Sequence, residues 1–570
     1  MKENWFVLPK NEMLSNSLAN ALSIHPVIAQ LLVNRGITTV DEARTFIDPK
    51  LKNLNDPFLF NDMEKCVSRV LEAHKRKEKV AFYGDYDVDG ITSSALLSLL
   101  FTEIGIENEC YIPHRISEGY GLSKEGIDYC SESGAKLIIT VDCGIHAFEE
   151  IKYAKELGLN VIVTDHHEPS EDVPECLGII NPKIKNSGYP FRDLAGVGVA
   201  FKLAHGLIKK AREYDCEWAF NIDLKKYLDF VALGTIADIV PLKGENRVLA
   251  KNGFIQICKS NRPGIKSLKN KTGIGDTITS FDIAFRIAPR INATGRIGDA
   301  KDSLLILKTD DYSKADFLAN NLDSNNKERQ KIEEKVYKEA LAEVDEKINL
   351  EEDKVIVIEK DNWPVGVVGI VSSKITKLFY RPSFVISMDE DGCKGSGRSI
   401  DGFDLSRALE DCADILDGFG GHKCAAGITL KKENVDEFRL RINQIASKEL
   451  KQEDLVKKNT VDAMLSLADI NEEIVSQLEL LQPFGQDNPS PVFISKKMVC
   501  DSNPIILKEK HVKFYIKGPK GSIEAIYFNI GERINDIEKG MMINLVYQLS
   551  FNHFNGRTSI QLNIKDFEKV

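Results

Sequence analysis

Short apolar runs alternate with amphipathic segments over residues 79–164, and this alternation constrains the fold more than any other feature of the sequence. The apolar runs cover 79–83, 110–113, 136–141 and 160–164, and helix-like segments begin at 91 and 146. Strands that alternate with helices form a parallel sheet covered by helices on its faces. The sequence therefore predicts an α/β domain, a class of fold that binds ligands at the carboxyl ends of its strands.

The rest of the chain predicts further domains. At about 150 residues per domain, 570 residues make three or four. Residues 310–350 are densely charged and contain no glycine or proline, which predicts one solvent-exposed helix, about 50 Å long, that joins two domains. A second α/β pattern follows, with strands at 354–358 and 383–387, a helix near 366–379 and a glycine-rich turn at 392–397.

These patterns predict five regions. They are an N-terminal segment (1–62), an α/β domain (63–309), a connecting helix (310–350), a second α/β domain (351–452) and an OB-like nucleic-acid-binding β-barrel (453–570). In the N-terminal segment, Thr39 followed by Val40 and two acidic residues predicts a capped helix start.

Composition excludes several classes of protein. The net charge of −11 argues against a bulk electrostatic grip on nucleic acid, although a local basic groove is compatible with it. The eleven cysteines are odd in number and form no C-x-x-C pair, so we expect reduced thiols and neither a disulfide framework nor a cysteine-rich zinc site. No apolar run is long enough to span a membrane, and the N-terminus lacks a signal-peptide pattern, so the expected location is the cytoplasm.

The first motif with chemical content is an acidic cluster at the end of the first predicted strand. Asp85, Asp87 and Asp89 lie two residues apart there. Carboxylates so close together repel each other and raise their own pKa values unless a cation neutralises them, which favours a metal site. An EF-hand loop begins with the same spacing, but its twelfth position is Leu96 instead of glutamate, and a strand precedes it. A solvated aspartate-rich turn remains the alternative for this motif taken alone.

Two later strands end in similar residues. Asp142 follows the strand at 136–141, and Asp165, His166 and His167 follow the strand at 160–164. Asp238, after an apolar helix, completes the candidate set. Oxygen ligands with one or two imidazoles suit Mn²⁺ or Mg²⁺, and there are enough ligands for two ions bridged by one carboxylate. Two ions about 3.5 to 4 Å apart can activate water and clamp the attacking and leaving oxygens of a phosphoryl displacement.

At these residues the sequence resembles the DHH phosphoesterase superfamily, which is named for the triplet at 165–167. Further motifs narrow the resemblance to its bacterial single-strand-specific DNA exonucleases. They are PRINATGR (289–296), WPVGVVGIV (363–371), KGSGRSI (394–400), GGHKCAAG (420–427) and QPFGQDNPSPVF (482–493). The similarity covers about residues 60–570. It implies a parallel-sheet DHH domain and a second α/β domain of DHHA1 type, joined by the long helix and followed by the OB-like barrel.

The resemblance also implies roles for the candidate ligands. Asp142 would bridge two metals, one held with Asp85 or Asp87 and the other with Asp89, His166 and Asp238. His167 would orient the scissile phosphate or the ligands themselves. The catalytic set would thus be Asp87, Asp89, Asp142, His166, His167 and Asp238. Tyr83 stands where some members have histidine, which leaves the role of Asp85 open, and Pro364 and Val365 stand where the family often has His-Pro.

Candidate phosphate-binding residues lie in two places. Arg286, Arg290 and Arg296 fall within eleven residues, and Asn292 and Arg296 flank Gly295 in a turn-like segment. Guanidinium groups suit phosphate oxygens, although salt bridges with the many acidic residues are the alternative. The composition at 396–399 suits an anion-binding turn. By resemblance, Ser396, Arg398 and Arg115 would bind the 5′-terminal phosphate, and His422 would line the same cleft unless it is a core residue.

The C-terminal region carries a basic patch with aromatic residues. Lys508, Lys510, Lys513, Lys517 and Lys520 fall within thirteen residues, and Phe514 and Tyr515 lie among them. OB-like barrels typically bind single strands with lysines that follow the DNA backbone and aromatic rings that stack on the bases. We therefore expect the DNA to contact Lys508, Lys510, Lys513 and Phe514. A solvated hairpin is the alternative.

The motifs together with the resemblance imply a metal-dependent 5′-to-3′ exonuclease that releases 5′-mononucleotides from single-stranded DNA in repair and recombination. The family resemblance implies a helicase and a single-strand-binding protein as partners, and we expect a monomeric enzyme without membrane association. One alternative is a DHH phosphodiesterase acting on short oligonucleotides or cyclic dinucleotides, which would be expected to lack the barrel and the QPFG segment. The other is a non-catalytic DNA-binding scaffold, which would have lost ligands.

Overall fold

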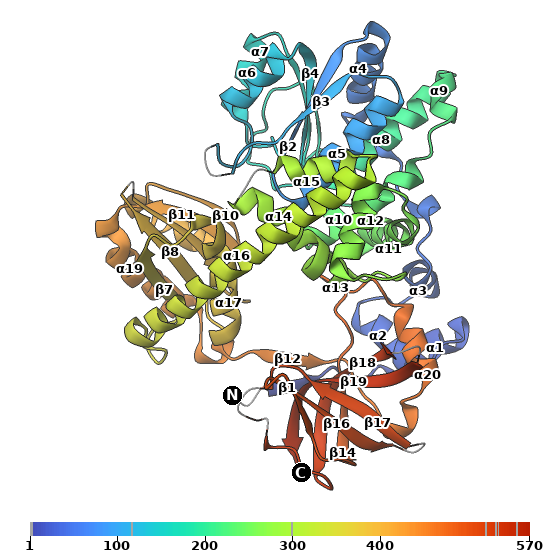
Figure 1. The fold of residues 1–570 in the computed structure, drawn as a ribbon, viewed down its shortest axis with the longest axis vertical. Helices are drawn as coiled ribbons and strands as arrows, with labels where there is room; N and C mark the ends of the chain where they lie inside the picture. Colours follow the sequence, from blue (N-terminus) through green and yellow to red (C-terminus); the bar gives the residue numbers. More distant parts are fainter. Residues whose placement is uncertain are drawn as a thin grey trace. The chain divides into compact units, whose positions relative to one another are not determined.

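A computed structural model describes residues 4–115, 118–297, 300–390, 392–518, 521–530, 533, 535–554 and 557–570 (Figure 1). The chain forms two compact units. The larger contains Trp5–Gly295, the start of the long helix up to Asn320, and Thr460–Val570; the smaller contains Asn321–Asn459 together with Arg296. Each of the eleven cysteines is a free thiol, as expected. None of the helices among the described residues is long and apolar enough to cross a membrane.

The larger unit contains the predicted parallel sheet. Its strands lie in the order β3-β2-β4-β5-β6, all parallel. Their bounds are β2 (Lys79–Gly84), β3 (Asn108–Tyr111), β4 (Ala135–Val141), β5 (Asn160–Thr164) and β6 (Gly178–Ile180). Because β3 and β4 lie on opposite sides of β2, the chain reverses direction across the sheet at β2. Ligands bind at such switch points in open α/β sheets.

Helices cover both faces of this sheet (Figure 1). On one face lie α6 (Lys124–Glu132) and α7 (Phe148–Glu156), whose Ile127 and Ile151 share a core with Ile138 and Val163 of the strands. On the other lie α4 (Met63–Arg76), α5 (Val88–Glu103) and α8 (Gly196–Glu213). The strands are buried on both faces, which explains their nearly unbroken apolar sequences.

A helical layer continues the larger unit after the sheet. It comprises α9 (Glu217–Phe220), α10 (Leu228–Ala237), α11 (Gly244–Lys259), α12 (Pro263–Thr272), α13 (Ser280–Asp282), the π-helix η4 (Ile283–Ile287), α14 (Ala288–Ile297) and α15 (Lys301–Lys308). The buried helix α10 packs against α5, α8 and α11. The turn expected around Asn292 and Gly295 is wrong, because both residues lie within α14.

The N-terminal segment forms α1 (Glu12–Leu22), α2 (Pro26–Asn34) and α3 (Val40–Ile47). The predicted helix start is confirmed, since Thr39 and Glu42 form a capping box at α3. Buried residues of α1 and α2, such as Leu18 and Leu31, share one core with Phe493 and Leu545 of the C-terminal barrel. The two ends of the chain therefore fold together.

The long helix α16 runs from Tyr312 to Lys347, as predicted, but it is not simply solvent-exposed. Leu318 and Leu322 are buried in its first half. Val336, Ala340 and Val344 in its second half join the core formed with α17 (Val365–Phe379) and β7 (Ile356–Asp361). The apolar residues of α16 recur at helical spacing and form a buried stripe, although most residues of the helix are polar or charged.

The smaller unit contains a five-stranded sheet in the order β10-β11-β9-β8-β7. The other strands are β8 (Ser383–Asp389), β9 (Gly392–Arg398), β10 (Gly418–His422) and β11 (Ala425–Leu430), and the helices include α18 (Leu405–Glu410) and α19 (Val435–Glu449). The turn expected at 392–397 is wrong, because this segment is the central strand β9. A Cβ on Gly397 would lie 2.4 Å from the Phe384 ring, so glycine here permits close packing instead of a turn.

The C-terminal region forms a seven-stranded sheet in the order β13-β14-β18-β19-β17-β16-β15. Its strands are β13 (Ala463–Met464), β14 (Phe493–Val499), β15 (Ile505–Leu507), β16 (His511–Gly518), β17 (Gly521–Tyr527), β18 (Met542–Phe554) and β19 (Arg557–Lys569), and α20 (Glu472–Glu479) precedes β14. A bridge between Cys500 and Ile516 brings the end of β14 to β16 and curls the sheet toward closure. A separate ladder pairs β1 (Asn4–Val7) with β12 (Lys458–Val461).

Candidate metal centre

The loop after β2 presents three aspartates at the switch point. Asp85 is buried, and Asp87 caps α5 by accepting hydrogen bonds from the backbone N–H groups of Asp89 (2.8 Å) and Gly90 (3.3 Å). Asp89 accepts from the N–H groups of Gly196 (2.6 Å) and Val197 at the start of α8. A Cβ on Gly90 would lie 2.4 Å from the Asp85 carbonyl oxygen, so this tight turn requires glycine. Two helix N-termini thus hold the acidic loop in place.

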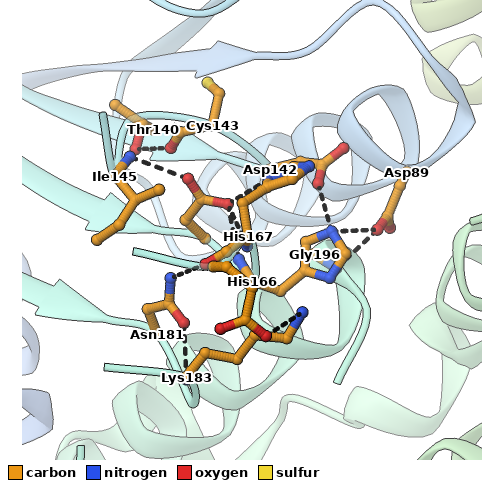
Figure 2. A network of polar contacts seen from close by, with 12 residues as sticks. Asp89, Thr140, Asp142, Cys143, Ile145, His166, His167, Asn181, Lys183 and Gly196 are labelled. Carbon is orange, nitrogen blue, oxygen red and sulfur yellow. Dashed lines mark hydrogen bonds and ion pairs between the residues drawn. The ribbon is translucent and has the colours of Figure 1, made fainter. Parts of the chain in front are cut away.

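The ends of β4 and β5 add the next ligand candidates (Figure 2). Asp142 is buried and adopts a left-handed backbone conformation with φ of 61°. His166 Nε2 lies 3.1 Å from Asp142 Oδ1, 3.5 Å from Asp238 Oδ2 and 3.9 Å from Asp89 Oδ2. Asp238 comes from the C-terminal end of α10. Three carboxylates from distant parts of the sequence therefore meet around one imidazole nitrogen.

Asp165 has a different role from its neighbours. It is fully buried and accepts hydrogen bonds from the backbone N–H groups of Ile145, His166 and His167, and its Oδ1 lies 2.7 Å from His167 Nδ1. These partners lower its pKa to about 2, although burial alone would raise it. Asp165 therefore shapes the turn that carries His166 and His167.

The candidate ligands form two groups in which potential ligand atoms lie within 4.8 Å of one another. One group is Asp85, Asp87 and Asp142, and the other is Asp89, His166 and Asp238. Asp142 also groups with His166 and His167, so it adjoins both. The structure thus brings together all six predicted metal ligands.

The electrostatics of this cluster favour a bound cation. Burial, reinforced by the neighbouring aspartates, raises the pKa of Asp85, Asp142 and Asp238 well above the ordinary value, and it raises the pKa of Asp89 to about 7. Burial also lowers the pKa of His166 to about 3, which keeps its imidazole neutral. Without a positive charge, the carboxyls would have to bind protons at neutral pH.

Buried polar atoms without partners test whether metal fits this site. Among the described residues, Asp85 Oδ1, Asp142 Oδ1 and both ring nitrogens of His166 are buried and form no hydrogen bond. Such atoms are costly unless something satisfies them, and a divalent cation would satisfy several at once. A set of carboxylates with one neutral imidazole matches the preference of Mn²⁺ and Mg²⁺.

His167 and Tyr120 lie at the edge of the cluster. Burial by itself would lower the pKa of His167, but its hydrogen bond with Asp165 and the charge of that carboxylate raise it. Tyr120 Oη lies 3.1 Å from His167 Nδ1 and donates to the Asp142 carbonyl oxygen at 3.3 Å. Sequence reasoning missed Tyr120, whose only signal is its place between two glycines in the loop after β3.

Two of the predicted phosphate-binding residues of the larger unit, Arg115 and Asn292, contact the acidic loop. The Arg115 guanidinium stacks over the Tyr86 ring, 5.0 Å from its centre. Asn292 accepts a hydrogen bond from the Val88 N–H at 3.0 Å, so its amide supports the loop itself. Arg290 donates to the Arg286 carbonyl oxygen one turn back along the helix.

Four further candidates belong to the smaller unit. Arg398 on β9 donates to Ser396 Oγ at 2.9 Å, which brings a hydroxyl and a guanidinium together. A Cβ on Gly369 of α17 would lie 2.9 Å from that hydroxyl, so glycine lets the helix approach. His422 is exposed at the end of β10, which excludes the core-residue interpretation. Arg296 donates to the Gly366 carbonyl oxygen at 3.0 Å.

Known domain families match three parts of this chain. The DHH family N-terminal domain matches residues 79–235, the DHHA1 domain matches 352–448 and the RecJ OB domain matches 461–566. The single-stranded-DNA-specific exonuclease RecJ of Bacillus subtilis is 40% identical over 99% of this chain and 71% of that protein. The protein of the same name from Haemophilus influenzae is 34% identical over 97% of this chain and 98% of its own length. The chain belongs to the RecJ family.

A solved RecJ structure supports the fold. RecJ from Thermus thermophilus in complex with Mn²⁺ is 29% identical, covers 100% of this chain and 80% of that one, and superposes with a TM-score of 0.84. The predicted architecture is therefore confirmed: a parallel-sheet DHH domain and a DHHA1-type α/β domain joined by the long helix, with a C-terminal OB-like domain.

In the region that matches the RecJ OB domain, the predicted contact between Phe514 and DNA is wrong. Phe514 is fully buried in the barrel core, because Val512, Phe514 and Ile516 alternate inward along β16. Phe514 therefore cannot stack on DNA. Tyr515 lies on the opposite face, where the Lys513 ammonium is 5.6 Å from its ring centre. The sequence shows this two-residue alternation of apolar residues at 512, 514 and 516, and it would have indicated Tyr515 instead of Phe514 as the exposed ring.

The predicted lysines of this region differ in their surroundings. Lys508 and Lys510 are exposed in the hairpin between β15 and β16. Lys513 pairs with Glu524 at 2.5 Å, so part of its charge is already neutralised. Lys520 lies outside the described residues.

Proposed function

We propose that this chain is a metal-dependent 5′-to-3′ exonuclease that degrades single-stranded DNA to 5′-mononucleotides in repair and recombination. The observation that carries the proposal is the pair of ligand groups adjoining Asp142 at the switch point of the parallel sheet. The substrate follows from the family, since the B. subtilis and H. influenzae relatives are named single-stranded-DNA-specific exonucleases.

Two ions, Mn²⁺ or Mg²⁺, would occupy the centre. Asp142 with Asp85 or Asp87 would hold one, and Asp89, Asp142, His166 and Asp238 would hold the other. When bound, such ions supply Lewis acidity that activates water and stabilises charge on phosphoryl oxygens. RecJ structures from T. thermophilus with Mn²⁺ and with Mg²⁺ support this choice of metals.

The chain's own residues hold and orient the reacting groups. Asp165 fixes the turn that carries both histidines. The raised pKa of His167 favours its protonated form, whose Nε2 can donate to a phosphate oxygen while Nδ1 faces Asp165. His167 would thus orient the scissile phosphate instead of ligating metal.

The remaining site residues would bind the strand. Arg290 and Arg296 would contact phosphates, and the hydroxyl and guanidinium pair of Ser396 and Arg398 suits a terminal 5′-phosphate. Arg115 and His422 would contribute further phosphate contacts, and Asn292 would act through the acidic loop that it supports. Lys508, Lys510 and Lys513 would contact strand farther from the metals.

Cleavage of single strands labelled at either end, with Mn²⁺ present, tests this function. We expect a labelled mononucleotide as the first product from the 5′-labelled strand, and progressively shorter fragments from the 3′-labelled strand. Asp142→Asn should abolish both, whereas the same exchange at the exposed surface residue Asp41 should not. Undiminished cleavage by Asp142→Asn would contradict the metal mechanism. A preference for dinucleotides over long strands would favour the phosphodiesterase alternative.

We also propose that the enzyme acts as a monomer in the cytoplasm, on single strands opened by a helicase and covered by a single-strand-binding protein. Sedimentation of the purified chain and pull-down with each partner class test these points separately.

A further inference from the structure

Two phenylalanines stay exposed on a helix that has already buried its apolar face. The segment Ser280–Ile297 is one helical run, and Ile283, Ile287 and Ile291 point into the core at intervals of four residues. Phe281 and Phe285 are 58% and 67% exposed, and their ring centres lie 4.8 Å apart with 31° between the ring planes. Neither ring is needed for the core, yet both keep apolar surface in water.

Arginines accompany this aromatic pair. The Arg286 guanidinium lies 6.0 Å from the centre of the Phe281 ring and pairs with Asp282 at 3.0 Å. Arg290 follows one turn later. Exposed aromatic rings beside guanidinium groups form the surface that single-stranded nucleic acid prefers, because every base has a face that stacks and every nucleotide has a phosphate.

The same helix reaches the metal centre. Asn292 supports the acidic loop through Val88, and a Cβ on Gly295 would lie 3.0 Å from the Tyr86 carbonyl oxygen. Seven residues separate Phe285 from Asn292, about 10 Å along a helix axis. A π-helix at Ile283–Ile287 interrupts the regular turn under the rings, a feature frequent at functional sites.

We propose that Phe281 and Phe285 form a base-stacking platform for single-stranded DNA. The platform holds bases a short distance along the strand from the phosphate being cleaved, while Arg286 and Arg290 hold the intervening phosphates. This inference rests on the proposed function and extends it, since it assigns a contact with bases where the other candidates contact phosphates.

Binding of fluorescent oligonucleotides, measured by anisotropy in an Asp142→Asn background that prevents cleavage, tests the platform. We expect the double variant Phe281→Ala/Phe285→Ala to bind a normal strand about tenfold more weakly. Phe220→Ala, which alters an equally exposed ring on α9, should bind as the background protein does. An oligonucleotide with contiguous abasic sites should bind the background protein weakly, and the double variant no more weakly.

Phe285→Trp provides a second measurement. It should keep the affinity, and its fluorescence should be quenched when DNA binds. The proposal is overturned if the double variant binds like its background, or loses the same affinity for normal and abasic strands. Quenching by an added protein partner but not by DNA would assign the surface to that partner and overturn it too. Failure of the parent chain to cleave DNA would count against the proposed function, whereas these binding results judge the platform.

A second observation concerns the segment that follows Asp238. Ile239 is a β-branched residue in the left-handed region, with φ of 60°, and its side chain is mostly exposed. This conformation is unfavourable for isoleucine and persists only where the surroundings impose it. The strain lies directly beside a predicted metal ligand.

The QPFGQDN loop of the C-terminal region holds this segment. The Leu242 N–H donates to the Gln486 carbonyl oxygen at 2.9 Å, and Lys243 pairs with Asp487 at 3.0 Å. The Leu242 side chain packs so closely on Gly485 that a Cβ there would lie 2.7 Å from Leu242 Cδ1.

Buried polar side chains hold the QPFGQDN loop itself in place. The fully buried Arg247 guanidinium donates to the carbonyl oxygens of Leu480, Gln482 and Pro483. Asn488 donates to those of Leu481 and Pro483, and it accepts from Arg35, the residue after α2, at 2.7 Å. This much polar bonding makes the loop a rigid support.

The geometry points to residues 482–489 as a positioning element for Asp238, so that the C-terminal region completes the metal centre as well as binding DNA. Titration of Mn²⁺ followed by electron paramagnetic resonance tests this role. We expect Gly485→Val to weaken Mn²⁺ binding about tenfold at the site that Asp238→Asn removes. Adding Leu242→Ala, which makes room for the valine, should restore it.

Gly275→Val is the matched control, because a Cβ at Gly275 meets no atom within 4 Å. A lower melting temperature of Gly485→Val with unchanged Mn²⁺ binding would overturn the positioning role. So would a loss of Mn²⁺ binding that Leu242→Ala does not reverse.

Discussion

At the scale of single residues, Asp142 and Asp165 show how aspartates 23 positions apart take opposite roles at one sheet edge. Asp142 is buried with an unsatisfied carboxylate oxygen, and its neighbours Asp89 and Asp238 repel its charge. Asp165 is equally buried, but every hydrogen bond it accepts favours the ionised form. The Asp142 carboxylate is therefore destabilising until a cation binds, whereas the Asp165 carboxylate stabilises the fold itself.

Asparagine substitutions at these two positions should therefore change stability in opposite directions. In the presence of a chelator, Asp142→Asn should raise the melting temperature, because it removes a buried carboxyl that must otherwise bind a proton or keep a repelled charge. Asparagine also tolerates φ of 61°. Asp165→Asn should lower the free energy of unfolding by roughly 2 to 3 kcal/mol, because a charged acceptor is lost. Calorimetry of both variants measures this contrast, and a destabilised Asp142→Asn would refute the repulsion argument.

His205 on α8 carries the clearest pH dependence away from the metal centre. Burial, with Lys202 nearby, lowers its pKa to about 4 from the ordinary 6.5. Its contribution to stability is thus complete above pH 6.5 and is lost as the pH falls toward 4, because only the unfolded state binds the proton in that window.

Urea unfolding at pH 7 and at pH 4.5 should reveal this loss. The difference between the two free energies of unfolding should be smaller in His205→Gln than in the parent by up to about 3 kcal/mol. An equal difference in both proteins would show that His205 already protonates in the folded state.

At the scale of elements, two helix starts hold the acidic loop of the metal centre in place. The starts of α5 and α8 converge on the acidic loop, where Asp87 caps α5 and Asp89 caps the first N–H groups of α8. Gly196, the first residue of α8, lies so close that a Cβ would be 2.6 Å from Asp142 Oδ1. The position of α8 relative to β4 therefore sets the position of Asp142.

Two glycine substitutions in α8 should separate helix stability from site geometry. Gly196→Ala should lower Mn²⁺-dependent cleavage about 10- to 100-fold, because the new methyl displaces Asp142. Gly198→Ala meets only Leu194 at 3.2 Å and should keep most of the activity, since alanine is the better helix former. Equal activity of the two variants, measured as initial rates on one strand, would contradict this account.

At the scale of the whole molecule, the division into two units places all the predicted metal ligands in one unit and none in the other. All six predicted ligands lie in the larger unit, together with the N-terminal helices and the C-terminal barrel. The smaller unit has its own core around Phe384, Phe438 and Ile442. The net charge of −11 is consequently a poor guide to nucleic-acid binding, because the acidic residues of the metal centre are predicted metal ligands.

Thermal unfolding should therefore show two transitions, of which Mn²⁺ raises only one. At a free concentration 100 times the dissociation constant, the ion should stabilise the larger unit by about 2.7 kcal/mol. Hydrogen exchange should slow at the ends of β2, β4 and β5 and stay unchanged in the sheet of the smaller unit. An equal shift of both transitions would mean that the units unfold together.

Much of this organisation could be predicted from the sequence, because it depends on local periodicity. The apolar runs at 79–83, 136–141 and 160–164 became parallel strands, and parallel strands deliver the residues after them to one edge, so Asp85, Asp142 and His166 meet. The long charged segment became α16 for the same reason.

Other features depended on contacts between distant segments, which a local pattern does not specify. Only the tertiary structure decided that 392–397 is a central strand, that Phe514 faces the core, and that α1 and α2 complete the C-terminal barrel. The tertiary structure also decided the role of Asp165. This residue follows a strand just as the predicted ligands do, but hydrogen-bond donors from its neighbours satisfy its charge. The sequence by itself determined which chemical groups follow each strand. The packing of segments hundreds of residues apart decided which groups are buried unsatisfied and which are supported, because burial and hydrogen bonding are properties of the assembled core.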